Sequence, residues 1–266
     1  MSGSDDDHLP FRSGPGAHAL DLRQLTAARV ALGRSGAGVP TRAHQRFVLD
    51  HARAREAVWT PIDWAPVESA LRGAGFDVVP AESRAEDRAT YLRRPDLGRA
   101  LSQGARERLQ GEKPDDGAPC DVAIVVADGL SATAVALNAA PLVLGVSERF
   151  AARGWRIAPV VLATQARVAL GDDAGEALGA RLCVVLIGER PGLSAADSLG
   201  AYLTFDPRPG TPDSRRNCIS NIREGGLAVA DAARQIEALA ERMFSQERSG
   251  VALARDATPP SIGDGS

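Results

Sequence analysis

The sequence has almost no lysine, few aromatic side chains and no tract of one charge. Lys113 is the only lysine among 31 basic residues, and the formal net charge is −3. Nucleic-acid and membrane-surface proteins usually carry a concentrated basic patch, so both classes are disfavoured. No apolar run approaches the roughly eighteen residues of a membrane-spanning helix. Aromatic residues make up 4% of the chain and hydrophobic residues 44%. This balance is typical of a core of Ala, Val, Leu and Ile, as in helices packed on a buried sheet.

Cysteine and targeting patterns are also sparse. Cys120, Cys183 and Cys218 lie far apart, with no CxxC pair and no Cys/His ligand spacing. Neither a disulfide framework nor a zinc site is therefore expected. The first ten residues, MSGSDDDHLP, are acidic and polar and lack the apolar segment of a secretion signal. Both features favour a reducing, cytoplasmic environment.

Composition divides the chain into four segments. Residues 1–19 and 249–266 are rich in Ser, Gly, Asp and Pro and are predicted to be flexible tails. Residues 20–118 are arginine-rich and predicted to be helical, and residues 119–248 alternate strands with helices. Helices are expected in the second segment at Asp21–Arg34, from Pro40–Thr41 to Val58, at Asp63–Gly75 and at Asp96–Leu109, with a linker at Gly111–Pro119.

The helix after Pro40 carries an apolar stripe at spacings of three and four. Its members are Ala43, Phe47, His51, Ala54 and Val58. A lone histidine on such a stripe is typical of a core or interface residue rather than of a catalytic one. We expect the arginine-rich region 20–118 to contact a partner protein, with Tyr91–Pro95 as part of the contact.

The third segment predicts the fold class. Its apolar runs are expected to be strands at Asp121–Val126, Ile157–Ala163, Leu182–Ile187 and Ser198–Phe205. Helices are expected at 132–153, 169–178 and Val229–Phe244, with Pro141 kinking or dividing the first. This alternation predicts an α/β fold: a Rossmann-like, mostly parallel sheet with flanking helices, preceded by a smaller N-terminal helical region.

In such a sheet, ligands bind beyond the carboxyl ends of the strands. Polar residues follow three of the predicted strands, at Asp128, at Thr164–Val168 and at Gly188–Gly192. Two interpretations of Glu189 stay open. It forms a solvated pair with Arg190 where a strand ends, or it lies at the mouth of a cleft and accepts hydrogen bonds from a polar ligand.

Asp128 and Cys218 also have two interpretations each. Asp128 stabilises its own turn or contacts a ligand, and Cys218 is a small packing residue or a thiol with a role.

Several common catalytic signatures are missing. The chain has no GxGxxG, no GxxxxGK[ST] and no GxSxG, which disfavours a nicotinamide cofactor, a P-loop nucleotide and a serine hydrolase. All four histidines, His8, His18, His44 and His51, precede the α/β segment. A catalytic triad or a histidine metal site therefore cannot be built from that segment alone.

Longer motifs are more specific. The stretches YLRRPDLGRAL, DVAIVVADGLSATAV, IGERPGLSAADSLGAYLTF and RNCISNI occur in this order. With the helices around them they resemble the small subunit of ethanolamine ammonia-lyase, from about Leu25 to about Phe244. The resemblance implies an adenosylcobalamin-dependent carbon–nitrogen lyase that converts ethanolamine to acetaldehyde and ammonia by a radical route. It also implies that a larger barrel subunit holds the ethanolamine and that cobalamin lies between the two subunits.

The resemblance further implies which residues contact the cofactor. Val168, Glu189 and Cys218 match the cobalamin contacts of that family, and this chain supplies neither catalytic residues nor protein ligands to a metal. Some cobalamin proteins replace the cofactor's lower base with a histidine in a D-x-H-x-x-G loop, which this sequence lacks. We therefore expect base-on cobalamin, with its dimethylbenzimidazole on cobalt.

Location and rival functions complete the sequence predictions. Family members packaged in bacterial microcompartments often carry an amphipathic N-terminal helix, and residues 1–19 show no clear one. A cytoplasmic location is expected, and encapsulation stays open. The alternative function is a stand-alone Rossmann-like enzyme acting on a nucleotide or sugar, with Asp128 and Glu189 as acid and base. A nucleic-acid module built on the arginine-rich helices is disfavoured by the acidic net charge.

Overall fold

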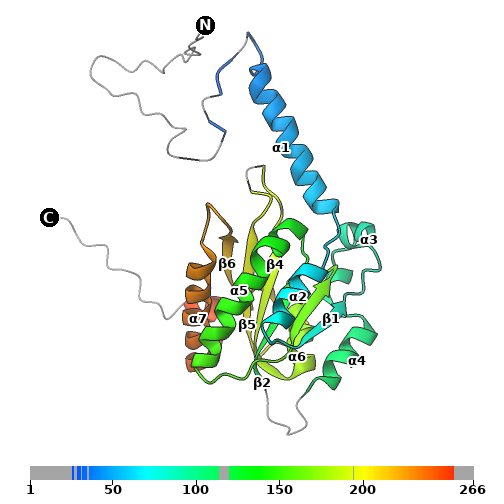
Figure 1. Ribbon diagram of the computed structural model, residues 1–266, viewed down its shortest axis with the longest axis vertical. Coiled ribbons are helices and arrows are strands. Elements are labelled where there is room, and N and C mark those ends of the chain that lie inside the picture. Colours follow the sequence, from blue (N-terminus) through cyan, green and yellow to red (C-terminus); the bar gives the residue numbers. More distant parts are fainter. Residues whose placement is uncertain are drawn as a thin grey trace, which may run out of the picture.

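The computed structural model describes residues 26, 29–30, 32–34, 36–113, 120–193 and 195–254. They form a layered α/β body from which the long helix α1 projects (Figure 1). The strands are β1 (Val78–Glu82), β2 (Cys120–Ala127), β3 (Val160–Thr164), β4 (Ala180–Gly188), β5 (Leu199–Phe205) and β6 (Asn217–Ile222). The α-helices are α1 (Thr41–Trp59), α2 (Ala65–Gly73), α3 (Arg88–Arg93), α4 (Gln103–Gly111), α5 (Ala132–Ala152), α6 (Leu170–Leu178), α7 (Val229–Gln246) and α8 (Val251–Ala254). None of the helices in these ranges is both long enough and apolar enough to cross a membrane.

The sheet confirms the predicted fold class. Its six strands run in the order β1-β3-β2-β4-β5-β6. The first four of these are parallel, and β5 and β6 add antiparallel pairs at one side. Helices α2, α5 and α7 contribute to the apolar core on one face, whereas α4 and α6 contribute to a second core on the other. Covering both faces explains why β2 and β4 are nearly continuous apolar runs.

The connections around β2 create a switch point. The chain leaves β2 through α5 and returns as β3 on one side, then leaves β3 through α6 and returns as β4 on the other side of β2. Because α5 and α6 cover opposite faces, the loops after β2 and β3 diverge at the carboxyl edge. An open sheet of this topology has its ligand crevice at such a point.

Two strands were missed by the sequence prediction. Strand β1 lies within the segment predicted to be helical, and Pro80 at its centre argues against a strand. Proline is tolerated because β1 is an edge strand that pairs only with β3. Strand β6 is the opposite edge, and only Ile219 and Ile222 of it are buried, so it lacks a strong apolar signal.

Two helix predictions differ in detail from the structure. The helix expected at Asp96–Leu109 is divided into a 3-10 turn at Leu97–Arg99 and α4. Ser102 caps α4 by accepting the Ala105 N–H at 3.1 Å, and Leu101 donates its N–H to buried Asp173 at 3.0 Å. This tertiary contact breaks the helix. Pro141 neither ends nor divides α5, whose carbonyl at exposed Leu137 can reach water.

The ends of the chain differ from the prediction where they are described. Residues 26, 29–30 and 32–34 are not helical, against the helix expected at Asp21–Arg34, and the rest of that helix lies outside the described residues. Residues 249–254 belong to the body rather than to a flexible tail. The buried Ser249 hydroxyl donates to the Arg215 carbonyl at 2.5 Å, and Leu253 is 1% exposed. Residues 1–19, 114–119 and 255–266 lie outside the described ranges.

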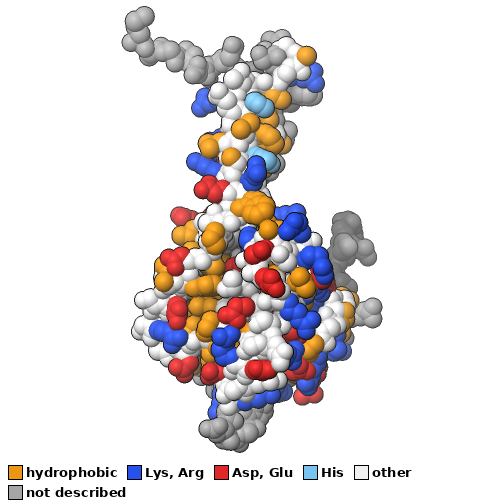
Figure 2. Space-filling view, turned by 90° about the vertical axis from the view of Figure 1, so that its right-hand side faces the viewer, with side chains coloured by type: hydrophobic (Ala, Val, Ile, Leu, Met, Phe, Trp, Pro, Cys, Tyr) orange, Lys and Arg blue, Asp and Glu red, His pale blue; other side chains and the backbone are white. Residues whose placement is uncertain are grey.

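Helix α1 begins after Pro40 and ends before Pro61, as predicted. Its apolar stripe, however, faces outward: Phe47 is 43% exposed, and Ala57 is the single buried residue of the helix. Figure 2 shows hydrophobic and histidine side chains together on this projecting helix. A helix gains most of its stability from packing of its apolar side chains. The exposed part of this stripe is not packed against another element of the described chain.

Candidate functional site

The loops after β2, β3 and β4 meet beyond the carboxyl edge of the sheet. Together they line a cavity of about 410 Å³, whose walls include Gly129, Val168, Glu189 and Tyr202. The backbone there is packed tightly. Gly129 has φ +57°, and a Cβ at this position would lie 2.2 Å from the Gly188 carbonyl oxygen. Glycine is therefore required where the β2 loop passes the end of β4.

Glu189 is held in place by neighbours on both sides. Its Oε2 accepts the Ser198 hydroxyl at 2.5 Å and the Asn221 backbone N–H at 3.3 Å. Its backbone N–H donates to the Ser198 carbonyl at 2.9 Å. The other oxygen, Oε1, accepts no hydrogen bond from the residues that the structure describes and lies above Gly200. Glu189 is not a solvated partner of Arg190; one oxygen is fixed and the other is available to a ligand.

The segment after Glu189 is held by hydrogen bonds from two residues at the N-terminal end of α5. Buried Ser131 donates its hydroxyl to the Ala196 carbonyl at 2.6 Å. Buried Asn138 donates its side-chain amide to the Asp197 carbonyl at 3.0 Å. Each of these side chains is thereby paired in the interior, as buried polar groups require. The segment that carries Glu189 is therefore positioned by the body of the domain.

A second cavity, of about 510 Å³, adjoins the first. It is lined by Pro95, Arg99, Arg167, Val168, Tyr202, Asp213, Arg216 and Cys218. Three of these, Arg167, Val168 and Tyr202, line both cavities. The structure thus brings the three residues singled out in the sequence to one continuous hollow: Val168 at the junction, Glu189 in one cavity and Cys218 in the other.

The pairing of β5 with β6 places Cys218 at this hollow. It lies on β6 directly opposite Tyr202 on β5, so the two side chains stand on the same face. Although Cys218 is exposed, partial enclosure of its thiol raises its pKa, opposed by hydrogen bonding with Tyr202. Burial also raises the pKa of the Tyr202 hydroxyl, and the nearby Glu189 carboxylate adds to the effect. Both groups are protonated at neutral pH, so neither acts as a base or a nucleophile there.

Asp128 has a structural role. Its carboxylate accepts the backbone N–H groups of Gln165 at 3.0 Å and Ala166 at 2.9 Å, and Arg88 Nη1 lies 3.2 Å away. The side chain is buried, and burial raises its pKa against these hydrogen bonds. Gln165 takes the left-handed conformation with φ +56°. Asp128 therefore ties the loop after β2 to the loop after β3, a structural role that differs from the predicted stabilisation of its own turn.

Arg167 is positioned by an aromatic residue that the sequence analysis did not assign to the site. Its guanidinium lies 4.1 Å from the centroid of the buried Tyr91 ring, and the Arg88 guanidinium lies 4.7 Å from the same ring. The Tyr91 hydroxyl donates to the Ala166 carbonyl at 3.0 Å. Neither Tyr91 nor Tyr202 carries a local sequence signal for this role; only the topology brings them to the hollow.

A buried ion pair lies behind the second cavity. Arg216 contacts Asp172 on α6 and also Asp213, and the Arg216 and Asp172 side chains are 3% and 2% exposed. Burial raises the pKa of Asp172 to about 6, in opposition to the positive charge of Arg216. Such a pair is costly to break because either partner alone would be a buried unpaired charge.

The described residues contain no group of three or more His, Cys, Asp or Glu side chains arranged to hold a metal ion. A mostly parallel sheet with a lined hollow beyond its carboxyl edge is the architecture in which α/β proteins commonly bind ligands.

Comparison with known proteins identifies the family. Residues 17–254 match the family model described as ethanolamine ammonia-lyase light chain (EutC). Proteins named ethanolamine ammonia-lyase small subunit are 52% identical in Bradyrhizobium diazoefficiens over 94% of this chain and 96% of theirs, and 51% identical in Azotobacter vinelandii over 89% and 87%. The corresponding protein of Xanthomonas campestris pv. campestris is 50% identical over 91% of this chain and 89% of its own. The chain belongs to the ethanolamine ammonia-lyase light-chain family.

Proposed function

We propose that this chain binds adenosylcobalamin in the hollow formed by the two adjoining cavities and presents it to the large subunit of an ethanolamine ammonia-lyase. The observation that carries the proposal is the meeting of Val168, Glu189 and Cys218 in one hollow. These are the residues that the family resemblance implies as cofactor contacts. They come from three separate parts of the chain, and their convergence does not follow from sequence proximity.

The chemistry of the hollow suits a corrin ring. A corrin carries peripheral amides and methyl groups, so it needs hydrogen-bond acceptors, donors and apolar surface together. Glu189 offers the free Oε1 as an acceptor, and Arg99 and Arg167 offer guanidinium donors. Val168, Pro95 and the ring of Tyr202 supply apolar contact. Each contact need only orient the ligand, because the reactive chemistry belongs to the cofactor.

Bound adenosylcobalamin would supply the radical for converting ethanolamine to acetaldehyde and ammonia. The residues of this chain would bind and orient the ring and exclude water from one side of it. Asp128, the alternative acid of a stand-alone nucleotide or sugar enzyme, is engaged by Gln165, Ala166 and Arg88 and does not line either cavity. This arrangement favours a binding subunit over a self-sufficient enzyme.

The lower base of the cofactor should stay on cobalt. Residues 120–254 contain no histidine that could replace dimethylbenzimidazole. Electron paramagnetic resonance of the bound cob(II)alamin should therefore show nitrogen splitting that is unchanged when the protein's histidines carry 15N. A change of that splitting on labelling would contradict base-on binding.

Exposed apolar side chains on α1 support contact with the large subunit. Phe47, Val48, Leu49 and Trp59 are all more than 40% exposed. Large apolar side chains gathered on a projecting helix are typical of a surface that is covered in an assembly. Residues 20–118 were predicted to contact a partner, and α1 is the part of them that carries these exposed apolar side chains, whereas Tyr91 of the predicted Tyr91–Pro95 contact is buried.

The proposal is tested by a visible absorption titration with adenosylcobalamin. It is run on this chain alone and on this chain co-purified with a candidate large subunit, followed by an acetaldehyde assay with ethanolamine. We expect cofactor retention and turnover in the mixed sample. Turnover of a nucleotide or sugar by the isolated chain, without cobalamin retention in either sample, would favour the stand-alone alternative.

A further inference from the structure

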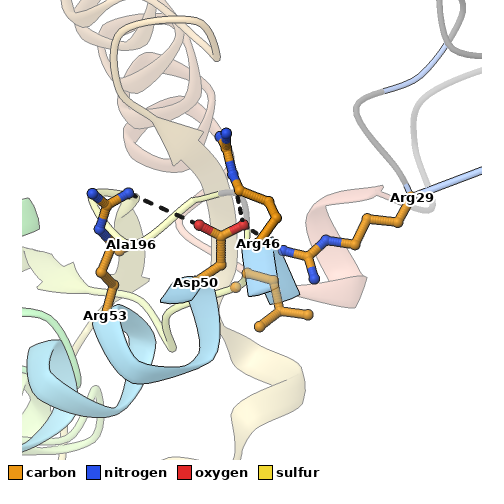
Figure 3. A pocket seen from close by; sticks show the side chains of 7 residues that line it. Arg29, Arg46, Asp50, Arg53 and Ala196 are labelled. Atoms are coloured by element: carbon orange, nitrogen blue, oxygen red, sulfur yellow. Dashed lines mark hydrogen bonds and ion pairs between the residues drawn. The ribbon is translucent and has the colours of Figure 1, made fainter. Parts of the chain in front are cut away.

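Away from the two cavities, three arginines surround a single carboxylate on α1. Arg29 Nη2 and Arg46 Nε lie 2.5 and 3.3 Å from Asp50 Oδ2, and Arg53 Nη1 lies 3.9 Å from Oδ1 (Figure 3). Arg46, Asp50 and Arg53 come from α1, whereas Arg29 reaches in from the segment before it. We refer to these three arginines with Asp50 as the arginine cluster.

The arginine cluster carries a net positive charge, and its hydrogen-bond donors outnumber the acceptors around them. Three guanidinium groups face one carboxylate, which leaves a net charge of +2. Asp50 is the single acidic residue among the described residues that line this hollow. Arg29 Nη1 is buried and has no hydrogen-bond partner within the described part of the chain. One carboxylate cannot occupy the donors of three arginines, so the cluster retains capacity for a further anion.

The hollow is large enough to admit an anion beside Asp50. Gly192, Leu193 and Ala196 form its other wall, and its volume is about 430 Å³. A planar carboxylate pairs with one arginine side by side, whereas a phosphate group offers oxygens in several directions. Arg46 and Arg53 on α1 and Arg29 from the segment before it surround Asp50, so a phosphate group beside Asp50 can accept hydrogen bonds from more than one of them.

We propose that the arginine cluster is a binding site for a phosphate group, held by Arg29, Arg46 and Arg53 beside Asp50. The group could be carried by a free phosphate compound or by the phosphodiester in the nucleotide tail of cobalamin. The segment Gly192–Ala196 links the site to the segment that carries Glu189. The phosphate site itself does not depend on cofactor binding.

The first test is calorimetric titration of the full-length chain with inorganic phosphate at low ionic strength. Wild-type protein should bind saturably. The double change Arg46→Gln/Arg53→Gln should weaken binding at least about tenfold, since it removes two of the three positive charges that face the anion. Both side chains are mostly exposed, so the fold should be preserved. Arg55→Gln, an exposed arginine of α1 outside the hollow, is the matched control and should leave binding unchanged.

A second variant separates binding from a structural role. Asp50→Asn removes the carboxylate that competes with phosphate for the arginines, so phosphate should bind several-fold more tightly. A purely structural cluster would instead lose stability and gain no affinity. Absence of phosphate binding, or binding that is equal in wild type and the double variant, would overturn the proposal. The proposal would also be overturned if wild type bound no phosphate and the double variant no longer co-purified with the large subunit. The arginines would then contact an acidic surface of that subunit.

The source of the phosphate is found by comparing cobalamin with cobinamide, which lacks the nucleotide tail. If the tail supplies the group, the double variant loses affinity for cobalamin but not for cobinamide. If a free phosphate compound supplies it, both affinities stay unchanged while inorganic phosphate binding is lost. Either result is consistent with a phosphate site, and the two are distinct from a failure of cobalamin to bind at all.

Discussion

At the scale of single residues, Ser198 is the nearest support of Glu189. It is 6% exposed and donates its hydroxyl to Glu189 at 2.5 Å. A hydrogen bond to a charged acceptor contributes roughly 1.5–3 kcal/mol, so Ser198→Ala should weaken cobalamin binding about tenfold by freeing the carboxylate to rotate. Equilibrium titration of the two-subunit complex measures this. Ser214→Ala, which removes an exposed hydroxyl, is the control. Equal affinities for all three proteins would show that Ser198 does not position Glu189.

Asp172 makes a pH-dependent contribution to stability. Its pKa is raised to about 6 by burial, from an ordinary value of 3.8. The folded state therefore binds the proton more tightly than the unfolded chain. The stabilising contribution is complete below about pH 4 and is lost as the pH rises through about 6, at most about 3 kcal/mol.

Comparing wild type with Asp172→Asn isolates the pH-dependent contribution of this carboxyl group to the free energy of unfolding. The variant carries a neutral side chain that resembles protonated Asp172, and Arg216 keeps its contact with Asp213. Urea unfolding between pH 4 and 7 should therefore show the stability of wild type falling relative to that of the variant as the pH rises, by at most about 3 kcal/mol. Wild-type stability that stays constant or rises relative to the variant would mean that Arg216 keeps Asp172 ionised.

At the scale of elements, the exposed face of α1 gives a prediction about assembly. Phe47 and His51 are exposed on it with ring centroids 6.0 Å apart, and the Arg29 guanidinium lies 5.4 Å from the centroid of the Phe47 ring. Phe47→Gln/His51→Gln should leave the unfolding free energy of this chain within about 0.5 kcal/mol of wild type, as for surface changes in general. The same change should reduce co-purification with the large subunit. Gln45→Ala, an exposed change on the same helix, should not.

The elements also show which parts of the fold are encoded locally. Helices α1, α5, α6 and α7 and strands β2 and β4 were predicted within a few residues because their apolar periodicity or continuity extends over long segments. Edge strands β1 and β6 were missed, since one contains Pro80 and the other buries only Ile219 and Ile222. The break before α4 depends on the contact of Leu101 with Asp173, which is distant in sequence. Such contacts have no local signature.

The site was predictable to a similar degree. The rule that ligands bind at the carboxyl edge selected Glu189 and the segment before α6, and the structure places both in one cavity. Cys218 was singled out by the family resemblance and not by its surroundings, because its meeting with Tyr202 depends on the antiparallel pairing of β5 and β6. The role of Asp128 could not be chosen from sequence, since its partners Gln165 and Ala166 follow a different strand.

At the scale of the whole molecule, the chain divides its tasks between two regions. The body offers a fixed hollow at the carboxyl edge of the sheet, and α1 projects beyond it with an uncovered apolar face (Figure 1). A cofactor bound between two subunits needs both features: a shaped surface that orients the ligand and a separate surface that docks the partner. Under the proposed function, this division would let the chain serve turnover by holding the cofactor and docking the large subunit.

The central claim is that the hollow around Val168, Glu189 and Cys218 holds cobalamin, and the most direct test is the amount of cobalamin retained per purified two-subunit complex, measured by visible absorbance after gel filtration. Wild type and Glu112→Ala, which changes an exposed glutamate after α4, should retain the cofactor equally. Glu189→Ala should retain much less, with affinity reduced about tenfold or more, while the complex stays assembled. Equal retention by Glu189→Ala and wild type would contradict the account and place the cofactor elsewhere.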